Sequence, residues 1–147
     1  MVLSLMHLTD LVLPAMRRKG WGRVITSTSS GVVAPIPNLG ISNTLRSTLV
    51  GWSKTLSNEV AAEGITVNVV LPGRIDTQRI GQLDEARAKR EGKSKSDVVK
   101  QSTKSIPAGR YGRPQEYANT VTFLDSARSS CITDLIIRVD GGYIASI

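Results

Sequence analysis

A cluster of hydroxyl side chains at residues 26–30 is the part of this sequence best suited to chemistry. The cluster follows the β-branched pair Val24 and Ile25, a pattern typical of the end of a β-strand. A loop rich in glycine and proline comes next and leads into a stretch whose apolar residues recur at helical spacing. In open parallel sheets, ligands bind just beyond the carboxyl ends of the strands. The cluster is therefore predicted to belong to a binding site.

The elements predicted around this cluster alternate between helix and strand. Helices are predicted over residues 3–18, 42–63 and from 114 onward, and strands over 23–28, 65–71 and 135–139. Strand, helix and strand in this order predict an α/β fold with a parallel sheet. Ser42 or Asn43 could cap the start of the second helix, and Gly64 could end it.

Two further segments have a distinctive composition. Residues 3–18 are apolar around most of a helix circumference, so this helix should be nearly buried or lie in a subunit contact. Residues 78–105 are polar and charged with weak periodicity. They are predicted to be helical in parts, mobile, and placed over the strand ends as a lid.

Composition narrows the classes of function. With one His and one Cys, the chain has neither a disulfide framework nor any usual zinc site, and a reducing, cytoplasmic compartment is expected. The net charge of +7 is compatible with an anionic cofactor or an acidic partner. Nucleic-acid binding is disfavoured because acidic residues interrupt the basic ones and aromatic residues make up only 4%. The apolar start lacks preceding basic residues and is shorter than the roughly 20 residues of a membrane span, so neither secretion nor a membrane anchor is expected.

Five motifs carry a resemblance to a known family. In chain order they are GRVITSTSSG, GWSKTLSNEVA, GITVNVVLPGRIDT, IPAGRYGRPQEYANTVTFL and ITDLIIRVDGG. Their order and spacing resemble the second half of a short-chain dehydrogenase/reductase, nearest to the 3-oxoacyl-acyl-carrier-protein reductase-like branch. The resemblance implies the C-terminal half of a doubly wound, Rossmann-type parallel sheet of about three strands, as a single partial domain over residues 1–147. It also implies NAD(P)(H) as hydride donor or acceptor and a small-molecule or acyl-thioester carbonyl substrate.

The resemblance assigns roles residue by residue. Ser29 matches the family's catalytic serine, whose hydroxyl holds the substrate carbonyl oxygen. The loop that contacts the nicotinamide end of the cofactor, PGxxxT in the family, is matched by Pro72, Gly73, Ile75 and Thr77.

The family's catalytic Tyr and Lys fall at Ser42 and Arg46, so SxxxR stands in place of YxxxK. Arg46 could keep the electrostatic and ribose-binding part of the lysine's role, because a guanidinium is always charged. An aliphatic hydroxyl is a far weaker acid than a phenol, so Ser42 cannot replace the tyrosine as a general acid. Reduction at this site would need water or another group as the proton donor.

The family's glycine-rich turn and first four strands have no counterpart in the 147 residues, so the sequence resembles a C-terminal fragment. The strand at Val24 should then be an unpaired edge, and self-association through helices 3–18 and 42–63 is expected.

Three hypotheses about function stay open. In the first, the chain is half of a hydride-transferring oxidoreductase; in the second, it is an inactive fragment or pseudoenzyme that acts as an interaction module. In the third, basic residues of the lid steer an acidic acyl carrier protein or a coenzyme A phosphate. The candidates for that steering are Arg87, Lys89, Arg90, Lys93 and Lys95.

Overall fold

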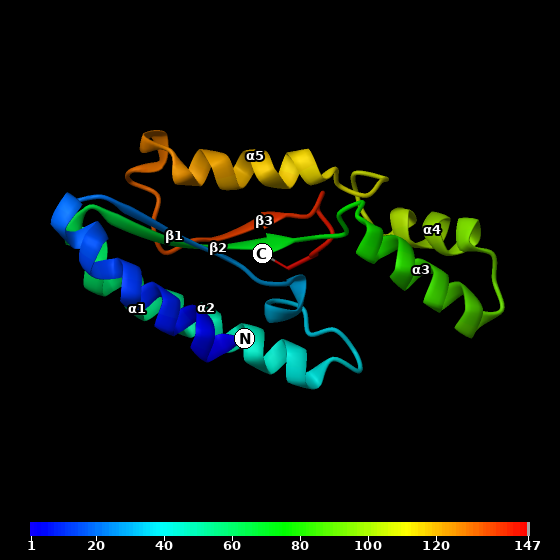
Figure 1. Ribbon diagram of the computed structural model, residues 1–147. Helices are drawn as coiled ribbons and strands as arrows, with labels where there is room; N and C mark the ends of the chain where they lie inside the picture. The colour runs from blue at the N-terminus through cyan, green and yellow to red at the C-terminus, as the bar shows by residue number, and fades with distance from the viewer. Residues whose placement is uncertain (147) are drawn as a thin grey trace.

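A computed structural model describes residues 1–146 as a parallel β-sheet with helices on both faces (Figure 1). In chain order the elements are α1 (Val2–Lys19), β1 (Gly22–Ser27), η1 (Ser30–Val32), α2 (Gly40–Val60), η2 (Ala61–Glu63), β2 (Ile65–Pro72), α3 (Gln78–Glu91), α4 (Lys95–Lys104), α5 (Pro114–Asp125), η3 (Ala127–Ser129) and β3 (Ile136–Val139).

The sheet has three parallel strands in the order β1-β2-β3. Gly22 pairs with Ile65 at one end of the β1–β2 ladder and Ser27 with Val70 at the other. The central strand β2 is buried at every position from Ile65 to Leu71, which its largely apolar sequence requires in a sheet covered on both faces. The predicted α/β fold with about three strands is confirmed.

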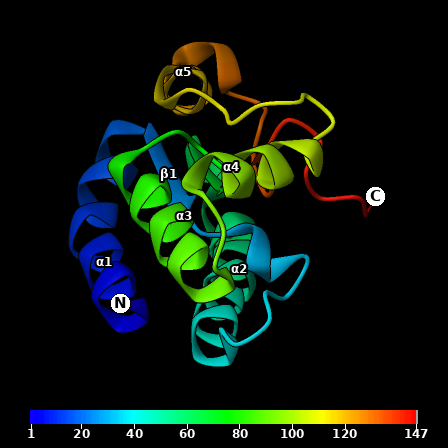
Figure 2. The ribbon, with the colours of Figure 1, turned by 90° about the vertical axis from the view of Figure 1, so that its right-hand side faces the viewer.

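Helices α1 and α2 cover one face of the sheet, and α5 covers the other (Figure 1). A buried apolar cluster joins α1 and α2 to β2; it consists of Leu13, Leu56, Val60, Ile65 and Val67. Helices α3 and α4 stand beyond the carboxyl ends of the strands, in front of the sheet when it is viewed from that end (Figure 2). The segment predicted as a lid is thus two helices beside the strand ends.

Some predicted boundaries were wrong by one or two residues. β1 runs over Gly22–Ser27 and β3 over Ile136–Val139. Helix α2 begins at Gly40, so Ser42 lies inside its first turn and does not cap it. Asn38 adopts a left-handed conformation (φ 64°) two residues before Gly40, and Leu39 is the N-cap of the helix. Gly64 ends the helical segment in a left-handed conformation, as predicted.

Helix α1 is not nearly buried. Its buried residues are Thr9 and Leu13, while Leu3, Leu8 and Leu11 are exposed, Leu3 by 79%. One stripe of α1 packs on β1 and α2, and no other element within residues 1–146 covers the opposite stripe. In the same part of the chain β1 pairs only with β2, so the predicted edge strand is confirmed. No helix within residues 1–146 combines the length and apolar character needed to cross a membrane.

Candidate functional site

The hydroxyl cluster lies where β1 ends and η1 begins. Ser29 has an extended backbone and caps η1, its Oγ accepting a hydrogen bond from Gly31 N at 3.1 Å. Thr28 N donates to Val70 O at 3.1 Å, which keeps the cluster attached to β2. The Ser29 side chain is half-buried, whereas Thr28 and Ser30 are buried. Because the Ser29 hydroxyl accepts in its bond to Gly31, its own proton remains available for a ligand oxygen.

Arg46 connects helix α2 to the end of β1. Its Nη1 donates to Thr28 O at 3.1 Å, and its Nε donates to Ser42 Oγ at 3.3 Å. The predicted pair Ser42 and Arg46 is thereby joined to the backbone next to Ser29. The Ser42 oxygen accepts the hydrogen bond from Arg46, so the Ser42 hydroxyl proton is available for a ligand.

The loop of residues 72–77 follows β2 at the same end of the sheet. Gly73 N donates to Val139 O at 3.0 Å, and a Cβ at Gly73 would lie 2.5 Å from Asp140 Cα, so only glycine fits. Ile75 forms an isolated parallel bridge with Gly112. Thr77 caps α3 through its Oγ1, which accepts from Ile80 N at 3.4 Å. Thr77 therefore has a structural function at this position in addition to the role that the resemblance implies.

Two tyrosines contact polar groups near the strand ends, and the sequence had not pointed to either. The hydroxyl of Tyr117 lies 2.6 Å from Ser27 Oγ, and partial burial raises the pKa of this phenol. Tyr111 donates to the buried carboxylate of Asp84 at 2.8 Å. A sequence signal for Asp84 did exist, since Ile80, Asp84 and Ala88 recur at i, i+4 and i+8 and so share one helix face.

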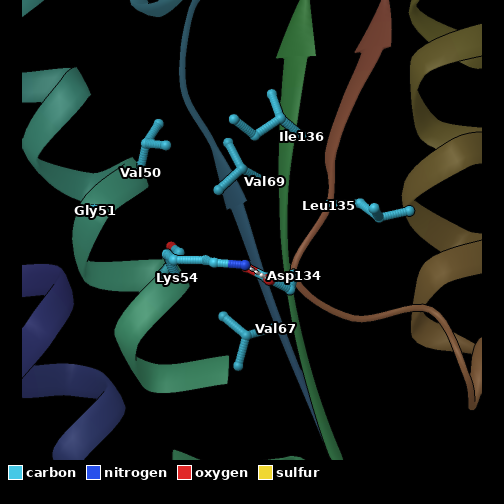
Figure 3. Close-up of a pocket in the computed structure, with 9 residues that line it drawn as sticks. Val50, Gly51, Lys54, Val67, Val69, Asp134, Leu135 and Ile136 are labelled. Atoms are coloured by element: carbon cyan, nitrogen blue, oxygen red, sulfur yellow. Dashed lines mark hydrogen bonds and ion pairs between the residues drawn. The ribbon is translucent and has the colours of Figure 1, made fainter. Parts of the chain in front are cut away.

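Hollows occur both beside the strand ends and away from them. One of about 410 Å³ adjoins Ser30 and is lined by the loop of residues 34–37, Ser105 and residues 143–145. Another, of about 380 Å³, lies between α2 and the sheet and is bordered by Lys54 and Asp134, which form an ion pair (Figure 3). The second hollow contains none of the predicted site residues. Within residues 1–146 no group of three or more His, Cys, Asp or Glu side chains could hold a metal ion.

Comparison with known proteins gives consistent matches. The family model described as "Enoyl-(Acyl carrier protein) reductase" matches residues 1–144. The 3-oxoacyl-[acyl-carrier-protein] reductase FabG of Salmonella typhimurium is 41% identical over 142 residues, covering 95% of this chain and 52% of the relative. FabG of Aquifex aeolicus is 35% identical over 136 residues, covering 91% of this chain and 50% of the relative.

Solved structures agree. YwfH, an NADPH-dependent reductase involved in bacilysin biosynthesis, superposes with a TM-score of 0.93 at 29% identity, covering 99% of this chain and 56% of that one. The actinorhodin polyketide ketoreductase with NADPH (variant F189W) gives a TM-score of 0.89 at 28% identity, covering 97% of this chain and 55% of that one.

The chain belongs to the short-chain dehydrogenase/reductase family and is similar to its 3-oxoacyl-acyl-carrier-protein reductases. It spans about half the length of the curated relatives it matches.

Proposed function

We propose that this chain carries the substrate side of an oxidoreductase that moves hydride between NAD(P)(H) and a carbonyl or alcohol. The observation that supports this most strongly is the pair of hydrogen bonds from Arg46, to Ser42 Oγ and to Thr28 O. They join the Arg46 guanidinium and the Ser42 hydroxyl to the backbone next to Ser29, at the carboxyl end of a parallel strand, the edge where such sheets bind ligands.

The arrangement suits a carbonyl oxygen that gains negative charge. Ser29 and Ser42 each keep a hydroxyl proton that can be donated. The Arg46 guanidinium donates to the Ser42 oxygen and so polarises that hydroxyl. Donors fixed in place before the reaction stabilise an oxyanion without reorganising. Neither serine is acidic enough to supply the proton, so water protonates the oxygen after hydride has reached the carbon.

The residues fit one end of a nicotinamide cofactor. When bound, the cofactor would supply or accept the hydride. In this proposal the nicotinamide end would be contacted by Pro72, Gly73, Ile75 and Thr77. The close approach of Gly73 to Asp140 holds this loop against the strand ends. The 147 residues contain no glycine-rich turn for the pyrophosphate, so the single domain over residues 1–147 is proposed as a partial one.

A restoration experiment tests this proposal. The double variant Ser42→Tyr with Arg46→Lys reinstates the tyrosine and lysine of the family pattern. Oxidation of NADPH and NADH should be followed with a panel of ketones and 3-oxoacyl thioesters, for the chain alone and for the chain joined to the first half of the Salmonella FabG relative. We expect the double variant to be about tenfold or more faster than the parent sequence, because a phenol replaces water as the acid.

Two controls accompany this assay. Ser29→Ala should lower the rate by about a hundredfold, as the loss of an oxyanion donor does elsewhere. Ser47→Ala, at an exposed serine of α2, should leave the rate unchanged. Turnover by neither the parent nor the double variant, in either form of the chain, would favour the alternative that this is an inactive protein acting through interactions.

A second proposal concerns how the substrate is presented. We propose an acyl thioester on an acidic carrier, supported by the similarity to 3-oxoacyl-[acyl-carrier-protein] reductases and by the basic residues of α3 and of the start of α4. Arg87, Lys93 and Lys95 are already paired with Glu91 or Glu85, whereas Lys89 and Arg90 are exposed and form no ion pair within residues 1–146. Charge reversal at Lys89 and Arg90 should slow carrier-bound substrates and spare small ketones; equal effects on both would contradict this proposal.

A further inference from the structure

Asp84 is a buried carboxylate in the most polar part of the chain. Its side chain is 2% exposed, and the only other buried residue of α3 is Ala88. Removing a carboxylate from water is costly unless charged or hydrogen-bonding partners compensate. The partners of Asp84 therefore indicate what this residue organises.

Asp84 contacts two segments that are far apart in sequence. Its Oδ2 accepts a hydrogen bond from the Tyr111 hydroxyl at 2.8 Å, and its Oδ1 lies 3.6 Å from Arg74 Nη1. Arg74 belongs to the loop after β2, and Tyr111 to the segment before α5. Burial, reinforced by Asp84, raises the pKa of Tyr111, so the phenol stays protonated and can donate.

The same two segments are joined by their backbones. Gly112 N donates to Arg74 O, and Asp76 N donates to Gly112 O, both at 2.8 Å. A Cβ at Gly112 would lie 2.8 Å from Ile75 Cδ1, so the segments are in close contact. This short ladder fixes the position of Ile75. Asp84, on α3, holds the side chains of Arg74 and Tyr111, which flank the ladder.

We propose that Asp84 is a positioning residue: by holding Arg74 and Tyr111 from α3, it fixes residues 74–77 at the strand ends. The consequence for hydride transfer rests on the proposed function, in which this loop meets the nicotinamide end of the cofactor. Asp84 thereby adds a side-chain link between α3 and the loop to the cap that Thr77 provides.

Amide hydrogen exchange on the 147-residue chain, read by NMR, tests this proposal directly. The reporter amides are those of Asp76 and Gly112, which form the ladder, and the reference is the Val69 amide, which donates to Leu135 O within the sheet. In Asp84→Asn the two reporters should exchange about tenfold faster, while Val69 changes by less than about twofold. Glu85→Gln is the matched control, because Glu85 is the next residue of α3 and its ion pair with Lys95 is exposed.

Tyr111→Phe gives an independent test that keeps the carboxylate beside Arg74. It should also speed exchange at Asp76, and this effect should vanish in an Asp84→Ala background if Asp84 is the link. Unchanged reporters in both Asp84→Asn and Tyr111→Phe would overturn the proposal. Acceleration of Val69 by the same factor as the reporters would also overturn it, since Asp84 would then act only on global stability.

Titration of the same samples with NADPH separates this proposal from the proposed function. If the parent chain binds NADPH, Asp84→Asn should weaken that binding by about tenfold while Glu85→Gln leaves it unchanged. Binding that survives Asp84→Asn at full strength would overturn the positioning role toward the cofactor. A parent chain that binds no NADPH counts against the proposed function, and the exchange data then decide the role of Asp84 in the loop.

Discussion

The sheet and the α3–α4 pair are held together by different forces. Strand β2 is buried from Ile65 to Leu71, with apolar side chains from α1 and α2 packed against it. Helices α3 and α4 together bury two apolar side chains, Ala88 and Val98, and rely on ion pairs and on the Asp84 network. Apolar packing is cooperative over many contacts, whereas exposed ion pairs contribute little. The contrast indicates that the α3–α4 pair can open while the sheet remains folded.

The largest expected effect is a core truncation in the sheet. Leu71 is fully buried, and Leu71→Ala should lower the free energy of unfolding by about 2–5 kcal/mol in a urea titration. Val98→Ala removes an equally buried residue of α4 and should speed amide exchange in α3 and α4 while β2 stays protected. If both variants reduce amide-exchange protection equally in β2 and α4, the sheet and the α3–α4 pair unfold together, and α3–α4 does not open separately.

Glycine substitutions should have opposite signs at two positions. Gly73→Ala should cost about 1–3 kcal/mol because its Cβ would overlap the backbone of Asp140. Gly51→Ala lies in α2 with no atom within 4 Å of the added carbon, and it should stabilise the chain by about 0.5–1 kcal/mol. Urea unfolding of both variants measures the difference, and a stabilising Gly73→Ala would show that residues 72–77 are not fixed to the strand ends.

Self-association should depend on the exposed stripe of α1. Leu8 is exposed, and Leu8→Glu should shift the sedimenting species toward the monomer at concentrations where the parent chain associates. Phe123→Glu, at an exposed position on α5 across the sheet, is the control and should leave the mass unchanged. If Phe123→Glu favours the monomer and Leu8→Glu does not, the self-association contact lies on α5 and not on α1 and α2.

Acid should produce the smallest effect, at the start of α5. Arg110 lowers the pKa of Glu116 to about 2, with a further contribution from the backbone of Arg113. A folded pKa below the unfolded value of about 4.5 means that the stabilisation is complete above pH 4.5 and is lost as the pH falls toward 2. Thermal unfolding of the parent chain and Glu116→Gln should therefore differ at pH 7 and converge near pH 2. Curves that remain parallel across this range would contradict the role given to Glu116.

The sequence was informative wherever burial imposes a pattern. The apolar run at residues 65–71 predicted a strand of the parallel sheet, which is buried from Ile65 to Leu71, and Gly64 predicted the end of the preceding helix. The start of α2 was placed two residues too late, because the spacing of apolar residues does not predict where a helix begins after a left-handed residue such as Asn38. For α1 the sequence left burial or a subunit contact open; the helix is not buried within residues 1–146, and periodicity identifies an apolar face without showing what covers it.

The candidate site was only partly predictable. Their spacing within the family pattern predicted Ser29, Ser42 and Arg46 as site residues, and that assignment stays a prediction; Arg46, on α2, hydrogen-bonds Thr28 O just past the end of β1. Asp84 was not singled out from the sequence, although its spacing with Ile80 and Ala88 places it on one helix face. Its partners, Arg74 and Tyr111, lie 10 residues before it and 27 after it, so only the fold brings them together.

We propose that Ser29, Ser42, Arg46 and the loop of residues 72–77 form one nicotinamide-facing site. The most direct test is an NMR titration of the isotope-labelled chain with reduced nicotinamide mononucleotide, which carries the nicotinamide end without the adenosine. We expect saturable shifts confined to residues 28–31, 42–46 and 73–77, and their loss in Arg46→Ala. Shifts centred instead on the hollow beside Lys54 and Asp134, or no saturable shifts from folded protein, would contradict it.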